Sequence, residues 1–428
     1  MRGMRLLLAV VLLFVATGSP ALADSGPVGA DVVVAQTLGE RELTVVVRRV
    51  DAPGPVQVEV VGHGVGGGLR LRVLPAGGRA TSETALDVPA VGVADTRLSV
   101  DRFGAWELEL DDGVDAARVP FQVLQRVTPA WERAAYGGFV AAGAFLLVAL
   151  PLAARRGWVV WVPVGGIVVS LTVAVTAALL SPTIPAPSTV SRVSNSDTGR
   201  PPANLVVTTD GAPVAGRPTA VELRFGDSGT GRPVDDLLVH HGALVHLEII
   251  SPGGVLAHVH PVRVAQGDYR VRFTPREAGR YALGAEIARA GGGSQLVRAE
   301  LAVGGTTVDS PEPSAEGRVE TGALVANRPV QLTADFGGAD DLQPWLGMRG
   351  HLFIVGPGER VWAHLHALTP AAAGGQPDET VAAYPARVPF TFTFPEPGRY
   401  RLWFQAERDY RIRTISTVVD IAADGGAR

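Results

Sequence analysis

A short histidine pattern occurs twice in the second half of this 428-residue chain. Each copy has an apolar run with one histidine, a turn that begins Pro-Gly, and a second apolar run with a His-x-His motif. The copies contain His246, His258 and His260, and then His351, His364 and His366. Apolar runs joined by a Pro-Gly turn are typical of β-hairpins, so each copy is predicted to be one hairpin.

The register of each hairpin decides whether its three histidines meet. Side chains alternate between the faces of a strand, so the two histidines of each His-x-His motif share a face. A three-residue Pro-Gly-Gly turn places His246 opposite His260, and a four-residue Pro-Gly-Glu-Arg turn places His351 opposite His366. Opposed Cβ atoms lie ~4.5–5.5 Å apart, close enough for two imidazoles to bind one metal ion at ~2 Å per bond.

Three neutral imidazoles on one face suit Zn(II) or Cu(II), and the missing ligand could be water, Glu248 or His241. The chain has no cysteine, which excludes disulfides, thiolate catalysis and a blue-copper centre. Hydrolytic zinc chemistry would need a general base, and Glu248 and Asp236 are candidates that nothing in the sequence singles out. The alternative is that the histidines are structural and bond to backbone carbonyls.

The similarity between the two copies extends beyond the hairpins. Residues 217–226 match 328–337, and residues 273–281 match 392–400. Strand patterns dominate around these segments, with no helical pattern of useful length. The sequence therefore predicts two homologous β domains in succession.

We place these repeats at 205–304 and 317–422. Residues 28–125 also read as roughly seven short strands with turns between them, as in an immunoglobulin-like sandwich. His63 lies there in a glycine-rich stretch, so we expect it to be exposed and not a ligand. Residues 1–23 have the basic start, short apolar centre and Ala-x-Ala exit of a secretory signal peptide.

Two apolar segments, 135–154 and 158–180, are each about long enough to cross a bilayer. Only Arg155, Arg156 and a glycine separate them, so they form a helical hairpin whose loop is cytoplasmic by the positive-inside rule. With the export signal, this topology places the first β domain and both repeats outside the cell membrane. Residues 181–204, rich in proline and serine, form an extended linker.

The predicted fold class is mainly β, with three immunoglobulin-like or cupredoxin-like β-sandwich domains and a two-helix transmembrane hairpin. A net charge of -4 gives no electrostatic case for nucleic-acid binding. The chain has no Gly-x-Ser-x-Gly motif and no phosphate-binding glycine loop, so we expect a protein that is not an enzyme.

Residues 205–422 resemble a group of bacterial extracytoplasmic β-sandwich domains, common in actinobacteria and sometimes found near copper or heavy-metal handling systems. The resemblance rests on the Gly-His-Leu start at 350–352, the His-x-His centre and the Pro-Gly-x-Tyr end at 397–400. It implies that the six hairpin histidines are the positions to carry over. Ala367 stands where proline is usual, and the first repeat has His241-Gly-Ala in place of the Leu-Gly start.

Three functions fit the sequence. The first is binding of copper or zinc by the two hairpins, to buffer the ion or pass it to a metal-handling partner. The second is an envelope scaffold or interaction protein with structural histidines. The third is a sensor or accessory subunit of a transporter. Glycines would allow its helices to approach a membrane-protein partner or one another, namely Gly137, Gly138, Gly143, Gly165 and Gly166. The metal, the partner and the oligomeric state stay open.

Overall fold

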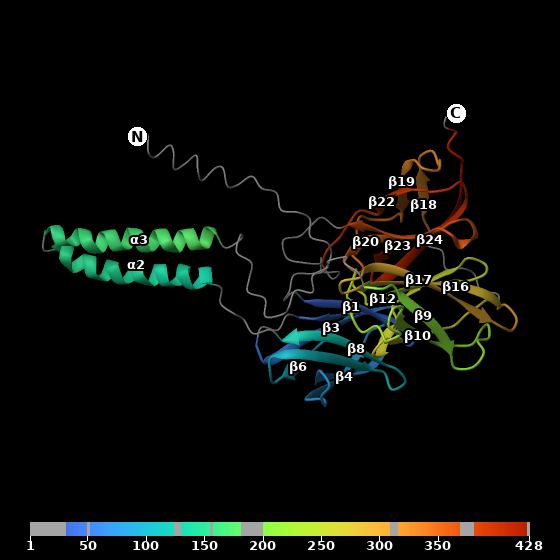
Figure 1. Ribbon diagram of the computed structural model, residues 1–428, viewed down its shortest axis with the longest axis horizontal. Coiled ribbons are helices and arrows are strands. Elements are labelled where there is room, and N and C mark those ends of the chain that lie inside the picture. The colour runs from blue at the N-terminus through green and yellow to red at the C-terminus, as the bar shows by residue number, and fades with distance from the viewer. Residues whose placement is uncertain are drawn as a thin grey trace.

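The computed structural model is mainly β, with several sheets and two long apolar helices (Figure 1). It describes residues 31–48, 52–123, 130–154, 157–180, 200–308, 316–368 and 381–425. The predicted signal peptide, the Arg155-Arg156 loop and most of the predicted linker lie outside the described residues. Mainly β structure is confirmed, whereas the immunoglobulin-like type of each sheet pair stays a prediction.

The first part of the chain forms eight strands, where about seven were expected. They are β1 (Val32–Leu38), β2 (Arg41–Val47), β3 (Gly54–His63), β4 (Gly67–Pro75), β5 (Ser82–Val88), β6 (Val91–Val100), β7 (Gly104–Asp111) and β8 (Ala116–Val123). Two four-stranded sheets, β1-β2-β3-β6 and β5-β4-β7-β8, enclose one apolar core. Alternating Val and Leu side chains, such as Val56, Val58 and Val60, supply this core and are fully buried.

The first repeat contains the first histidine hairpin. Its strands are β9 (Ala203–Thr209), β10 (Thr219–Asp227), β11 (Leu237–Leu238), β12 (Val245–Ile250), β13 (Leu256–Val259), β14 (Val262–Ala265), β15 (Asp268–Phe273), β16 (Gly279–Arg289) and β17 (Gly293–Val303). The sheet β14-β15-β10-β9 packs on a second sheet with the order β11-β16-β12-β13, to which β17 adds by pairing with β16. The hairpin β12–β13 thus lies beside the long strand β16.

The second repeat has the same arrangement. Its strands are β18 (Arg318–Thr321), β19 (Pro329–Asp335), β20 (Met348–Val355), β21 (Trp362–Leu368), β22 (Arg387–Thr393), β23 (Gly398–Arg408) and β24 (Arg411–Ile421). The sheet β21-β20-β23-β24 faces β18-β19-β22 across a separate apolar core. The hairpin β20–β21 lies beside β23, as β12–β13 lies beside β16.

Two long helices, α2 (Ala130–Ala154) and α3 (Trp161–Leu179), lie side by side away from the sheets (Figure 1). Both are long and apolar enough to cross a membrane. Gly138 and Gly166 are contact points between them, since a Cβ there would lie 2.7 Å from the Ser170 carbonyl oxygen or 2.8 Å from the Phe145 ring. The other three glycines named above meet no atom within 4 Å among the described residues, so only two of the five serve this packing.

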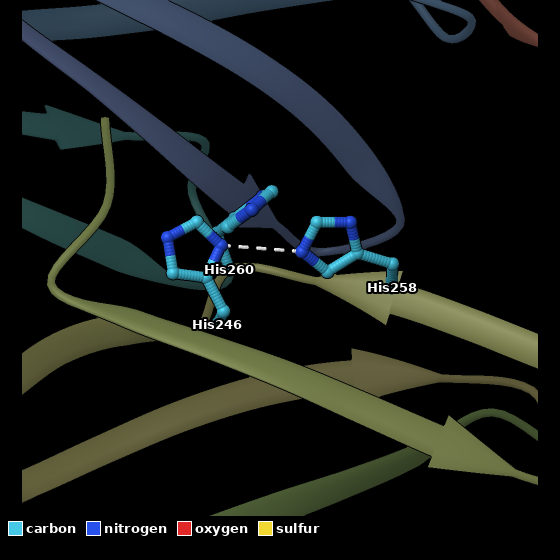
Figure 2. A group of neighbouring side chains, drawn as sticks. All are labelled: His246, His258 and His260. Atoms are coloured by element: carbon cyan, nitrogen blue, oxygen red, sulfur yellow. Dashed lines mark hydrogen bonds between the residues drawn. The ribbon is translucent and has the colours of Figure 1, made fainter. Parts of the chain in front are cut away.

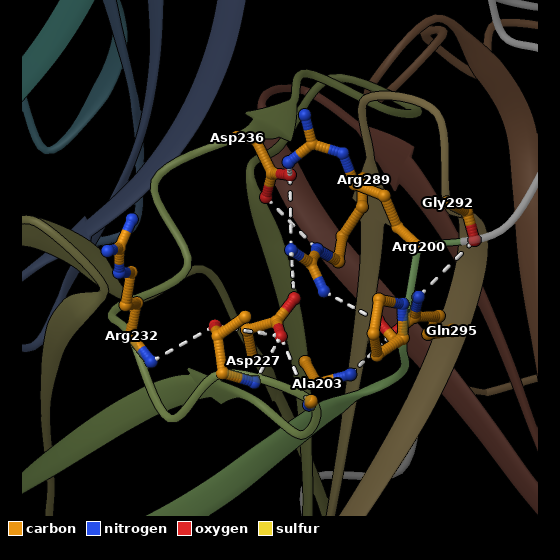
Figure 3. A network of polar contacts seen from close by, with 11 residues as sticks. Arg200, Ala203, Asp227, Arg232, Asp236, Arg289, Gly292 and Gln295 are labelled. Atoms are coloured by element: carbon orange, nitrogen blue, oxygen red, sulfur yellow. Dashed lines mark hydrogen bonds and ion pairs between the residues drawn. The ribbon is translucent and has the colours of Figure 1, made fainter.

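A buried arginine fixes the start of the first repeat (Figure 3). Arg289 is 3% exposed; it donates to Asp227 and Asp236 at 3.0 to 3.1 Å and to the Pro201 carbonyl at 2.7 Å. Asp236 also pairs with Arg200. Asp236 is therefore committed to arginines at the far end of β16, and it is not a general base beside the histidines.

The first sheet pair also packs against both repeats. The edge strand β1 donates to the first repeat, from Ala35 N to the Gly242 carbonyl at 2.7 Å and from Thr37 N to the His260 carbonyl at 2.8 Å. Ala35 shares a small apolar cluster with Trp345 of the second repeat. The edge strand β1, which comes before α2 and α3 in the chain, therefore covers the histidine hairpins that follow those helices.

Candidate metal centre

Both hairpins have the predicted register. In the second, His351 is directly opposite His366, across a four-residue turn. In the first, Leu247 pairs with Val259 and Glu248 pairs with His258, which continues to His246 opposite His260. The turn lengths inferred from the sequence are therefore confirmed, and each hairpin brings its three histidines to one face.

The first triad, defined as His246, His258 and His260, is almost wholly buried (Figure 2). One nitrogen from each of the three rings lies within 4.8 Å of the other two. His246 Nδ1 and His258 Nε2 are 3.2 Å apart, and His260 Nε2 is buried without a hydrogen-bond partner in the described structure. Three inner ring nitrogens therefore converge on one point.

The outer nitrogen of each of these rings faces an oxygen acceptor. His246 Nε2 donates to the His240 carbonyl at 3.0 Å, His258 Nδ1 to Gln405 Oε1 at 3.1 Å, and His260 Nδ1 to Glu42 at 2.6 Å. A neutral imidazole has one N–H and one lone pair. Because the outer nitrogens hold the protons, the inner nitrogens present lone pairs to one another, which is the tautomer that a metal ion requires.

The second triad, defined as His351, His364 and His366, repeats this geometry. His351 Nδ1 and His364 Nε2 are 3.2 Å apart, and the buried His366 Nε2 has no hydrogen-bond partner among the residues described. The outer nitrogens of the first two rings donate to oxygens, from His351 to the Trp345 carbonyl at 3.3 Å and from His364 to Glu286 at 2.8 Å. The first two rings of each triad are thus arranged alike, whereas the carboxylate acceptor serves the third ring, His260, in the first triad and the second ring, His364, in the second.

Each repeat supplies a hydrogen-bond acceptor to one histidine of the other repeat's triad. Glu286 and Gln405 occupy the same position in their repeats, since each lies opposite the first histidine of its own hairpin. Each nevertheless bonds to a histidine of the other repeat, Glu286 to His364 and Gln405 to His258. The triads are also close together, with the His246 and His364 ring centroids 5.4 Å apart. They form one six-histidine centre at the seam between the repeats.

Burial keeps these rings neutral. It lowers the pKa of His246, His258 and His364 well below the ordinary value, and neighbouring histidines lower it further. Burial also lowers the pKa of His351 to about 3. The rings therefore offer lone pairs rather than positive charge at neutral pH.

A buried carboxyl group, Glu248, and a half-buried one, Glu286, lie beside the second triad. Glu248, 3% exposed, has no hydrogen-bond partner on either oxygen in the described structure, and its Oε1 is 3.9 Å from His364 Nδ1. Glu248, Glu286 and His364 form a third group of converging ligand atoms. Burial, and then the neighbouring Glu286 charge, raises the pKa of Glu248 well above its usual range. The sequence makes Glu248 a candidate for a further ligand of the first triad. In the structure it instead faces His364 of the other repeat.

Two other histidines are placed differently from the predictions. His241 does not join the triad of its own repeat, because its ring lies against His366 of the other repeat, with centroids 3.9 Å apart. His63 is not exposed. It ends β3 at 8% exposure, its Nε2 lies 2.8 Å from Thr44 Oγ1, and its Nδ1 lies 3.2 Å from Glu407 of the second repeat.

Sequence reasoning missed the residues that orient the histidines. Glu286 and Gln405 were findable, because each interrupts a short apolar run at the same distance after the repeated Gly-Arg-Tyr. Glu42 had no such signal, since it lies in a different part of the chain from both repeats.

Comparison with known proteins adds little beyond this geometry. Residues 313–423 match a family described as a domain of unknown function, DUF8832. No curated protein matches the chain.

Solved structures with some similarity include a tetra-tandem repeat of a large adhesion protein, with 10% identity over 92% of this chain and 74% of that one, and a TM-score of 0.18. Another is the Salmonella alpha-2-macroglobulin, with 11% identity over 95% of this chain and 24% of that one, and a TM-score of 0.19. A bacterial ice-binding adhesin has 9% identity over 87% and 91%, with a TM-score of 0.19. Likeness at this level supports no argument about function.

Proposed function

We propose that this protein binds two transition-metal ions, one in each histidine triad, on the extracytoplasmic side of a membrane to which α2 and α3 anchor it. The observation that supports this most directly is the convergence of inner nitrogens whose rings already donate their protons outward. Buried lone pairs that face one another at 3.2 Å repel unless a cation lies between them. A structural role would need no such convergence.

The spacing favours Zn(II) over square-planar Cu(II). Two ligands at ~2.05 Å from a tetrahedral ion lie about 3.3 Å apart, whereas neighbouring ligands of a square-planar ion lie about 2.9 Å apart. In each triad the inner nitrogens of the first two histidines are 3.2 Å apart. In the described part of the chain no fourth side chain joins either triad. A fourth position left to water or to a partner's ligand suits a protein that exchanges its ion.

Metal titration of the full chain in non-ionic detergent tests this proposal. We expect two Zn(II) ions per chain for the natural protein and one for each double variant, His258→Asn with His260→Asn or His364→Asn with His366→Asn. The variant His63→Gln is the matched control, since His63 lies outside both triads, and it should still bind two ions. Circular dichroism shows that each variant folds. Absence of zinc and copper binding by the folded natural protein would contradict the proposal.

A further inference from the structure

A cavity of about 200 Å³ opens beside the carboxyl groups of Glu248 and Glu286 at the seam between the repeats. Glu248, Glu286 and His364 line one part of it, and Ser294 and Gln295 supply the other polar wall residues. Most of the remaining wall is apolar, formed by Ile250, Leu256, Leu296, Phe353, Val355 and Trp362. An apolar cavity with a few convergent polar groups is the usual form of a small-molecule site.

Glu248 indicates which chemical group fits this cavity. Both of its oxygens are buried and lack a donor in the described structure, although a carboxylate can accept several hydrogen bonds. Glu286 lies close by, and its Oε2 already accepts from His364 Nδ1. The unmet need is thus for a group with N–H donors, and a positive charge on that group would favour the ionised form of Glu248, which accepts them.

A third metal ion is a poor match for the same place. His364 Nδ1 holds the proton that it donates to Glu286, and its Nε2 belongs to the second triad. A metal ion on Nδ1 would have to displace that proton and leave an imidazolate between two metals. An ammonium group leaves the proton in place, because it donates hydrogen bonds and needs no lone pair from the ring.

We infer that this cavity binds a small primary ammonium ion with an apolar body. The ammonium group donates to Glu248, and the alkyl chain lies against Ile250, Leu256 and the ring of Trp362. The Trp362 indole N–H is already bonded to the Glu359 carbonyl at 3.0 Å, so the ring position is fixed. An aromatic ring near a desolvated cation adds further attraction. This site goes beyond metal binding, although its choice over a third metal rests on the second triad.

Calorimetric titration of the full chain in non-ionic detergent with n-butylammonium chloride tests the inference. We expect saturable binding of one ion per chain and no saturable binding of n-butanol or pentanoate, which have the same butyl chain without the positive charge. Glu248→Gln should weaken n-butylammonium binding at least tenfold. The control Glu300→Gln changes an exposed carboxylate on β17 and should leave binding unchanged.

Three results would overturn the inference: no saturable n-butylammonium binding, binding that Glu248→Gln does not change, or equal binding of n-butanol. Zinc titration of the same Glu248→Gln variant separates this site from the metal centres. That variant should keep two zinc ions, because the bond from His364 to Glu286 does not involve Glu248. Loss of zinc binding by every protein in the series would instead contradict the proposed function.

Discussion

Each triad has one histidine that donates to a carboxylate, and the two carboxylates come from different places. Glu42, in the part of the chain before helix α2, accepts from His260, and Glu286 of the first repeat accepts from His364. A carboxylate on the outer nitrogen makes the inner nitrogen more basic and fixes the ring. Each metal site can therefore be altered separately by one substitution away from its ligands.

We predict that Glu42→Gln weakens metal binding at the first triad, while the second triad is unchanged. Loss of such an outer carboxylate typically costs 10-fold to 100-fold in affinity. Glu286→Gln should produce the converse result. Competition titration with a chromophoric chelator resolves the two sites. Equal weakening of both sites by either substitution would contradict the pairings described here.

The low pKa of His351 makes the metal-free protein sensitive to acid. Its pKa falls from the ordinary 6.5 to about 3 on burial, so the unfolded chain binds more protons than the folded one between these values. The stabilising effect is full above pH 6.5 and is lost as the pH falls towards 3. Glu248 and Glu286 act in the opposite direction, because burial raises the pKa of each.

The effect of His351 is isolated by comparing the natural protein with His351→Phe. We expect the urea midpoint of the natural protein, measured in a metal chelator, to fall more steeply with pH between about 6.5 and about 3. A parallel pH profile for the two proteins would show that the pKa of His351 is the same in the folded and the unfolded protein.

At the scale of strands, the two hairpins fit together because β16, the strand beside the first hairpin, has a glycine without a side chain where the second hairpin approaches. Gly284 of β16 lies opposite Glu248. A Cβ on Gly284 would come 2.6 Å from the Trp362 ring and 2.7 Å from Glu248 Oε2. In the second repeat Trp403 occupies the corresponding position, and its indole N–H donates to the Gly254 carbonyl of the first repeat at 3.1 Å. The glycine of the first repeat thus leaves room for a side chain of the second, and the tryptophan of the second repeat contacts the backbone of the first.

Gly284→Ala should therefore destabilise the protein by about 1–3 kcal/mol, the usual cost of overpacking a buried contact. Gly226→Ala in β10 is the matched control, since a Cβ there meets no atom within 4 Å among the described residues. The control should be neutral within error. Thermal or urea unfolding of both variants measures the difference, and equal stability would contradict the close approach of Trp362 to β16.

The hairpins themselves could be predicted from the sequence, because turn length fixes register and register fixes which histidines are opposed. The contacts between hairpins could not, since they depend on how separately folded sheets pack. His63 illustrates the difficulty. Its glycine-rich surroundings suggested an exposed loop, but Gly62 serves close packing, as a Cβ there would lie 2.3 Å from the Pro89 carbonyl oxygen. The burial of His63 also involves Glu407, which is distant in the sequence.

At the scale of the whole molecule, the first sheet pair is part of the six-histidine centre. It supplies Glu42 to His260, and Thr37 Oγ1 accepts from the His260 backbone N–H at 2.7 Å. Ion pairs hold the same surfaces together elsewhere, as between Arg272 and Asp115 at 3.1 Å. The two apolar helices α2 and α3 lie between these parts in the sequence, so the centre joins chain segments on either side of them.

We therefore predict that a chain without residues 1–199 binds zinc more weakly at the first triad, by tenfold or more, and keeps the second triad nearly intact. The physical reason is that only the first triad loses an acceptor, Glu42. Competition titration and circular dichroism of this shortened chain beside the full chain provide the measurement. Unchanged affinity at both triads would mean that the first sheet pair does not contribute to the centre.

The exchange of Glu286 and Gln405 between the repeats has a further consequence for how such a centre could arise. A twofold axis between identical subunits makes every contact occur twice, once in each direction. The two repeats therefore stand to each other as the halves of an isologous dimer, joined in one polypeptide. In a protein with one copy, the histidine of the triad would gain this acceptor only when two copies of the protein paired. Once the copies are fused, the two halves can change independently. Glu286 in one repeat and Gln405 at the equivalent position of the other are an example of such a difference.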